Sequence, residues 1–277
     1  MVSLVLLALL SACDPTSYPN DSTPVADKRP QHGTTTTTST TVPAATSTTV
    51  PATTTSTTVP ATTTTSTTVP AGGGTTLFAD TFNGLLAGTP WLDDAIVGGW
   101  TSVYNGYGLN DVEVDGTNVL AESPQISTSA GQTHAGLVVT TNSFGDFDAT
   151  VRMKTVQQLR TGSAPNPWEV GWLLWHHTDD THFYYFVPKP NGWELGKEDP
   201  AYPGAQRYLA TAPTPTFPVG AWYTVRIREV GSTMTVWVNG TQIASFTDSQ
   251  RPYASGHLGL YNEDAHVRFD DVTVKAP

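Results

Sequence analysis

Residues 34–74 consist of Thr, Ser, Val, Pro, Ala and Gly alone, and this tract limits where the chain can fold. Without aromatic or large aliphatic side chains, it cannot bury enough apolar surface to offset the entropy of ordering its backbone. Proline and β-branched Thr favour extended conformations, so at ~3 Å per residue the tract predicts a stalk of about 100 Å. Folding is therefore confined to residues 75–277, a length that suits one β-sandwich or barrel with its own core.

Val2 to Leu10 form a nearly unbroken apolar run that is too short to span a bilayer but fits a signal peptide. The run ends in Leu10-Ser11-Ala12-Cys13, which resembles the bacterial lipobox and implies lipidation of Cys13. No Lys or Arg precedes the run, unlike the usual signal peptide. The sequence predicts a signal peptide at 1–12, a lipidated segment at 13–33 and anchoring to the outer face of the bacterial cell membrane. The alternative is a plain signal peptide.

The formal net charge is −11, and the acidic excess lies in the folded part. Residues 1–74 hold 2 Lys/Arg and 3 Asp/Glu, which leaves 11 and 21 for residues 75–277. Such a surface argues against nucleic acid or anionic lipid as a partner, so we expect membrane contact only through the lipid at Cys13. Because Cys13 is the one cysteine, no intramolecular disulfide can form.

Alternating apolar and polar residues predict that the domain is all-β. Three consecutive strands are expected at 221–230, 233–238 and 241–246, and Asn239-Gly240 forms a two-residue hairpin turn between the last two. Further short apolar segments predict strands at 147–154, 170–175, 182–187, 256–261 and 265–274.

Several segments carry a resemblance to one superfamily. These segments are Phe78–Phe82, Val112–Gly116, Trp237–Gly240, Gly256–Leu260 and Val267–Val272. Together they resemble the concanavalin A-like lectins and glucanases, most nearly their laminin G-like and 3-keto-disaccharide hydrolase domains. The resemblance implies a two-sheet antiparallel jelly-roll β-sandwich. It says less about activity, because this fold hosts lectins, adhesive modules, hydrolases and lyases.

Aromatic and charged residues interleave over residues 168–208, which makes this region the candidate site. Sugar rings stack on aromatic planes, and nearby charged groups bind their hydroxyls. Predicted binding residues are Trp168 and Trp193 as exposed platforms, together with Tyr185, Lys189, Lys197 and Arg207.

Two catalytic hypotheses use the same region. Glu169 and Glu194 would form an acid/base pair for glycoside hydrolysis. A polysaccharide lyase would instead use His182 or Tyr185 as base, with Lys189 or Arg207 neutralising a uronate. The alternative for Glu169 is a buried carboxylate that is satisfied by a Lys or Arg.

Structural calcium is a further expectation. In the superfamily a Ca²⁺ often lies between the first and last strands, and Asp80 with Asp270 or Asp271 match those places. Carboxylate oxygens are suitable ligands for this ion. The histidines lack zinc-site spacing.

Three functions remain open from the sequence. The first is a monomeric, surface-tethered module that binds an extracellular polysaccharide. The second is a glycoside hydrolase or polysaccharide lyase that acts on such a glycan. The third is a non-catalytic adhesive or cell-wall protein without a sugar site.

Overall fold

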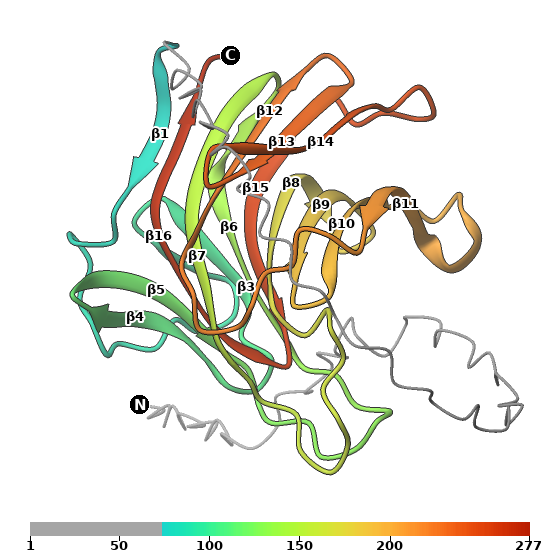
Figure 1. Ribbon diagram of the computed structural model, residues 1–277. Helices are drawn as coiled ribbons and strands as arrows, with labels where there is room; N and C mark the ends of the chain where they lie inside the picture. The colour runs from blue at the N-terminus through green and yellow to red at the C-terminus, as the bar shows by residue number, and fades with distance from the viewer. Residues whose placement is uncertain (1–73) are drawn as a thin grey trace, which may run out of the picture.

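The computed structural model describes residues 74–277 (Figure 1). The predicted signal peptide, the lipidation site Cys13 and the stalk lie outside the described residues. Within residues 74–277 the regular structure is strands, apart from a short 3₁₀ helix at Pro203–Ala205. None of the described residues form a helix long and apolar enough to cross a membrane.

The strands form two antiparallel sheets, and the predicted sandwich is confirmed. The first sheet has the order β14-β13-β12-β7-β16-β5-β4, with β1 paired to β16. Its strands are β1 (Thr76–Asp80), β4 (Leu109–Asp115), β5 (Thr117–Ser123), β7 (Phe147–Gln158), β12 (Tyr223–Val230), β13 (Thr233–Val238), β14 (Thr241–Thr247) and β16 (Ala265–Lys275).

The second sheet has the order β11-β10-β9-β8-β15-β6-β3-β2. Its strands are β2 (Ala95–Val97), β3 (Trp100–Tyr104), β6 (Ala135–Phe144), β8 (Gly171–Asp179), β9 (His182–Lys189), β10 (Gly192–Glu198), β11 (Gln206–Ala212) and β15 (Gly256–Glu263). In Figure 1 the strands β8 to β11 run side by side toward one edge of the molecule.

The hairpin predicted at Asn239-Gly240 is present between β13 and β14. These residues have φ angles of 50° and 79°, the positive values that a two-residue type I′ turn requires. The hairpin sets the register in which Val236 and Val238 of β13 face inward, where both are buried.

The main core lies between the two sheets. Val151 and Val225 reach it from the first sheet, and Leu173 and Phe186 reach it from the second. A second apolar cluster comes from strands of the second sheet alone and includes Leu137, Leu174 and Val187. Because side chains alternate across a strand, this second cluster lies on the outer face of the second sheet, away from the first.

Candidate functional site

The aromatic-rich region 168–208 is divided between two faces of the second sheet. On β8, Trp175 belongs to the core between the sheets, whereas Trp172 belongs to the outer-face cluster. On β9, Tyr184 points inward and Tyr185 points outward in the same way. This division is the alternation of side chains along a strand. The residues available for a site on this sheet are therefore those of its outer face.

Five rings follow one another along this outer face, and we call them the aromatic row. The ring centroids of His177 and Phe183 are 5.8 Å apart, and those of Phe183 and Tyr185 are 6.4 Å apart. Trp172 follows at 5.1 Å from Tyr185, and Tyr261 at 5.2 Å from Trp172. Rings in stacked, tilted and edge-to-face contact at such distances stabilise one another beyond the area that they bury. Four of these rings are 0–8% exposed and Phe183 is half-buried, so the row is a packed aromatic layer that spans β15, β8 and β9, with Phe183 as its most accessible ring.

Polar groups border the aromatic row. Gln206 donates to the Tyr185 hydroxyl at 2.7 Å, and the Tyr261 hydroxyl donates to Glu263 at 2.8 Å. Beside Tyr185, Gly196 of β10 has no side chain, and a Cβ there would collide with the Tyr185 ring and hydroxyl. Gly196 thus allows Tyr185 to lie across β10. The exposed Tyr208 pairs with Gly196 from β11.

Lys189 and Glu194 form an ion pair on the same face. Glu194 lies opposite Val187, whose side chain belongs to the outer-face cluster, and Lys189 follows Val187 by two positions on β9. Their side chains are 10% and 14% exposed, so each is largely buried and keeps a small exposed edge on this face. The structure thus brings together three predicted site residues, Tyr185, Lys189 and Glu194.

Glu169 lies in a different environment, next to the start of β8. It has no exposed surface, and its Oε1 accepts hydrogen bonds from Arg160 at 2.6 Å and Asn166 at 2.7 Å. Arg160 also donates to Asp264 at 2.6 Å. Burial raises the pKa of Glu169, while Arg160 and Asn166 counteract the rise. Glu169 and Glu194 therefore pair with different cations, and Glu169 has the enclosed arrangement of a structural ion pair.

Asp264 also brings Ser127 and His134 together, but not as a catalytic triad. The Ser127 hydroxyl lies 3.0 Å from His134 Nδ1 and donates to Asp264 at 2.5 Å. In a triad the carboxylate would orient the histidine ring, whereas Asp264 accepts from the serine and from the His134 backbone N–H. Since Ser127 and Asp264 have no exposed surface, this cluster joins two loops at the end of the sandwich.

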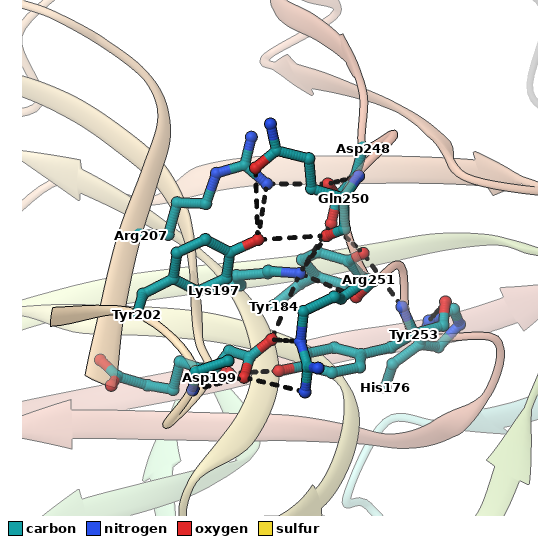
Figure 2. A network of polar contacts seen from close by, with 12 residues as sticks. His176, Tyr184, Lys197, Asp199, Tyr202, Arg207, Asp248, Gln250, Arg251 and Tyr253 are labelled. Carbon is teal, nitrogen blue, oxygen red and sulfur yellow. Dashed lines mark hydrogen bonds and ion pairs between the residues drawn. The ribbon is translucent and has the colours of Figure 1, made fainter.

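Lys197 and Arg207 lie in a second polar network (Figure 2). The Lys197 ammonium donates to Asp248 at 2.9 Å and to the backbone carbonyls of Gln250 and Arg251, both at 2.8 Å. Arg207 donates to the other Asp248 oxygen at 2.9 Å. All three ammonium protons of Lys197 are thus used within the protein, and none is left for a sugar. The network holds the β14–β15 connection against β10 and β11.

Trp193 was expected to be an exposed platform, and this prediction is wrong. It is 7% exposed and belongs to the core between the sheets, with its indole N–H donating to the Thr214 carbonyl at 3.0 Å. Trp168 is half-buried and packs against the outer-face cluster. His182 is 35% exposed, and its Nδ1 lies 2.9 Å from Asp179 in the β8–β9 turn. Of these three, Trp168 alone contacts the outer-face cluster.

Comparison with known proteins decides the family. Residues 88–275 match the 3-keto-alpha-glucoside-1,2-lyase-like domain. The chain belongs to this family. No curated protein matches the sequence.

Solved structures include similar proteins at low sequence identity. Carbohydrate-binding module CBM66 of Bacillus subtilis is 16% identical, with a TM-score of 0.48 over 67% of this chain and 99% of its own. The Bacillus licheniformis beta-glucanase is 12% identical, with a TM-score of 0.49 over 74% and 99%. A mixed-linkage glucan GH16 protein of Bacteroides ovatus, in complex with its G4G4G3G product, is 11% identical, with a TM-score of 0.47 over 72% and 99%. The lyase-like domain described here is a two-sheet antiparallel β-sandwich.

The residues proposed for calcium do not fit a metal site in this domain. One Asp80 oxygen accepts from the Phe82 N–H at 2.7 Å and the other from the Trp100 indole at 2.8 Å. Arg152 lies 3.4 Å from Asp270 and 2.8 Å from Asp271. Among the described residues, no group of three or more His, Cys, Asp or Glu side chains is arranged to hold a metal ion. The carboxylates expected to hold calcium are already bonded to protein donors.

Sequence reasoning missed His177, Tyr261 and Glu263 as parts of the lyase-like domain's outer face. The alternation of β8 is interrupted by a bulge, and His176 has a φ of 50°, so the face of His177 cannot be counted from Trp172. Tyr261 and Glu263 lie far from region 168–208 in sequence and reach it through the pairing of β15 with β8. The only signal for Tyr261 in the sequence was the period-two alternation along β15, which places Leu260 in the core between the sheets and Tyr261 on the opposite face.

Proposed function

We propose that the domain binds an extracellular glycan on the outer face of the second sheet. The observation that carries this proposal is the Lys189–Glu194 ion pair on the same face as the half-buried ring of Phe183 and the exposed ring of Tyr208. Aromatic rings match the apolar C–H faces of sugars, and a charged pair supplies both a donor and an acceptor for hydroxyl groups. Membership of a carbohydrate-active family supports the same conclusion.

Binding is favoured over hydrolysis by a carboxylate pair. A glycoside hydrolase of either stereochemical type needs two carboxyl groups that face the same bond. Glu169 is enclosed and held by Arg160, while Glu194 is held by Lys189 on β10. The predicted acid/base pair therefore has one member that a substrate does not reach.

Cleavage by another route is the second candidate, because the family is described as lyase-like. In an elimination, one group removes a proton and another assists the leaving group. Glu194 and Lys189 are an adjacent acidic and basic group on the outer face, and each keeps some exposed surface. If the chain is a lyase, this pair is the first place to look for the proton transfer.

A screen of the full chain against soluble polysaccharides and oligosaccharides separates these functions. Equilibrium binding and product release would both be recorded, for the wild type and for Glu194→Gln. Retention without products, weakened in Glu194→Gln, is the expected result. Products that disappear in Glu194→Gln would instead establish cleavage at this pair. If the screen shows neither binding nor products, an adhesive or cell-wall role without a sugar site is favoured.

We also propose that the domain is displayed from the outer face of the cell membrane. The lipobox at Leu10–Cys13 and the Thr-rich tract 34–74 support an anchor and a stalk that reaches through the cell wall. Metabolic labelling with a radioactive fatty acid tests the anchor. The wild type should incorporate label and Cys13→Ser should not, whereas equal labelling of both would exclude lipidation at Cys13.

A further inference from the structure

A buried polar cluster lies between the two sheets, where β4 and β5 face β6 and β15. Glu122 of β5 lies directly opposite Asn110 of β4. Each is two positions from a residue of the main core, Leu120 or Val112, so both side chains point between the sheets. Neither Glu122 nor Asn110 has any exposed surface. The two strands therefore place polar side chains inside a core that is otherwise apolar.

Asn262 of β15 and Gly136 of β6 reach this cluster from the second sheet. The Asn262 side chain donates to the backbone carbonyl of Glu122 at 3.0 Å and accepts from the Gly136 N–H at 2.8 Å. Gly136 has no side chain, and a Cβ there would lie 3.2 Å from Asn110 Oδ1 and 3.3 Å from the Glu122 Cβ. The side chains of Asn110 and Glu122 thus meet beside Gly136, enclosed by both sheets.

Three oxygen atoms of the cluster have no hydrogen-bond partner among the described residues: both carboxyl oxygens of Glu122 and Oδ1 of Asn110. The Asn110 Nδ2 donates to Ser102 Oγ at 3.1 Å and to the Tyr104 carbonyl at 3.0 Å, which fixes the orientation of the amide. If Glu122 is a carboxylate, all three unpartnered atoms are acceptors. A buried carboxylate without a donor is strongly disfavoured, so the cluster lacks one donor.

Charged side chains on the adjacent strands do not supply this donor. Within residues 74–277, those that flank the cluster point to the outer faces of the sandwich: Asp111 and Glu113 on β4, His266 and Arg268 on β16, and Glu263 on β15. Asp264, in the turn after β15, is bound to Arg160. Burial raises the pKa of Glu122 well above its usual value, and the Val138 N–H counteracts only part of this rise.

We propose that Glu122 is a neutral carboxylic acid in the folded domain and that its proton is donated to Asn110 Oδ1. One proton then removes a buried charge from Glu122 and gives Asn110 the donor that it lacks. Asn262 holds the same glutamate from the second sheet through the Glu122 carbonyl. The proton is therefore part of the joint between the sheets, and its loss at alkaline pH weakens that joint.

Infrared difference spectra of the full chain detect this proton directly. A protonated carboxyl group has a C=O stretching band that a carboxylate lacks, so the spectrum of the wild type minus that of Glu122→Gln at neutral pH should contain one such band. Glu229, whose pKa burial also raises, is present in both proteins and cancels. Carboxylate bands in the difference spectrum, without the band of a protonated carboxyl, overturn the proposal.

Urea denaturation across a range of pH measures the same proton through stability. The ordinary pKa of Glu122 is 4.5 and the folded value is well above it, so in this interval the native state binds more protons and stability falls as pH rises. Glu122→Gln cannot ionise and keeps a donor for Asn110. Relative to this variant, the folding equilibrium constant of the wild type should fall by up to about tenfold for each pH unit in the interval. Asp94→Asn, at an exposed position, is the control and should follow the wild type.

A second variant, Glu122→Met, separates ionisation from packing. It can neither ionise nor donate, so it should be less stable than Glu122→Gln at every pH and show the same pH dependence. Parallel pH profiles for the wild type and both variants would contradict a neutral Glu122. Replacing choline chloride by sodium or calcium chloride at equal ionic strength tests the other occupant. If these ions stabilise the wild type and not Glu122→Gln, a metal cation and not a proton lies between Glu122 and Asn110.

Discussion

Lys197 donates a hydrogen bond to Asp248 at 2.9 Å, and neither side chain has any exposed surface. Although burial raises the pKa of Asp248, hydrogen bonds from Lys197, the Gln250 N–H and Tyr184 hold it below its usual value. The Asp248 carboxylate is therefore ionised, and the pair is enclosed and fully bonded. It fixes the β14–β15 connection, and removing one partner leaves the other as an uncompensated buried charge.

Lys197→Met should consequently lower the free energy of unfolding by about 3–5 kcal/mol. Urea denaturation measures this change, and Lys197→Met/Asp248→Asn should be less destabilised than the sum of its single variants. Arg228→Met, at an exposed position on β12, serves as the control and should change stability by less than about 0.5 kcal/mol. A Lys197→Met protein as stable as this control would show that the network does not stabilise the fold.

Arg160 binds two buried carboxylates, those of Glu169 and Asp264. Arg160→Met should destabilise the domain by roughly 3–5 kcal/mol, because both carboxylates lose their cation. Glu169→Gln should be milder, since a glutamine oxygen still accepts from Arg160 Nε. Denaturation midpoints check both variants, and glycan binding by folded Glu169→Gln should match the wild type. If Glu169→Gln impaired binding or turnover without loss of stability, Glu169 would be part of the functional site.

Glu229 predicts a pH dependence of stability. Burial raises the pKa of Glu229 to about 8, with further increases from Asp146 and Asp248, and the indole of Trp175 donates to it at 2.5 Å. Between about pH 4.5 and 8 the native state therefore binds more protons at this group than the unfolded chain, so stability decreases as pH rises. The slope from this group is at most about 1.4 kcal/mol per pH unit.

Glu229→Gln isolates that contribution, because it keeps the acceptor for Trp175 and cannot ionise. The wild type should be nearly as stable as Glu229→Gln at pH 4.5 and progressively less stable than it up to about pH 8. Denaturation curves of both proteins across this range give the difference. A constant difference would mean that the ionisation state of Glu229 is the same in the folded and unfolded chains.

Gly196→Ala tests whether Tyr185 must lie across β10. The added Cβ would meet the Tyr185 ring, so Tyr185 must shift and the aromatic row must break at its centre. We expect a loss of about 1–3 kcal/mol of stability together with weaker glycan binding. The control is Gly84→Ala, because a Cβ at Gly84 meets open space, and it should change stability and binding very little. Gly220 is unsuitable for such a control because its φ is positive. Normal binding by Gly196→Ala would place the ligand elsewhere.

Much of the fold could be predicted from local patterns. The strands β12, β13 and β14 follow from period-two alternation and the turn at Asn239-Gly240, which are properties of neighbouring residues. The jelly-roll order was accessible only through resemblance. The site was less predictable, because its contacts depend on pairings between separate segments: Tyr185 and Gln206 are 21 residues apart, and Tyr261 meets Trp172 through the pairing of β15 with β8.

The error at Trp193 has a physical cause of the same kind. Its flanking Pro, Asn and Gly residues predict an exposed turn, and the turn does lie at residues 190–191. However, β10 begins at Gly192, and the alternation places Trp193 and Leu195 on the inner face. Which face a strand turns inward is decided by the whole sheet and is not encoded in five neighbouring residues.

Hydroxyl-radical footprinting of the full chain, with and without its tightest-binding glycan, tests the central claim most directly. Aromatic side chains react readily, and the two sheets offer a comparison within one molecule. We predict protection of Phe183 and Tyr208 on the second sheet. Trp222, which directly precedes β12, and Trp237 of β13 should be unchanged; these two tryptophans stack on Arg152 and Arg226 at 4.6 Å. Protection of Trp222 or Trp237, without protection of Phe183 and Tyr208, would contradict a glycan site on the outer face of the second sheet.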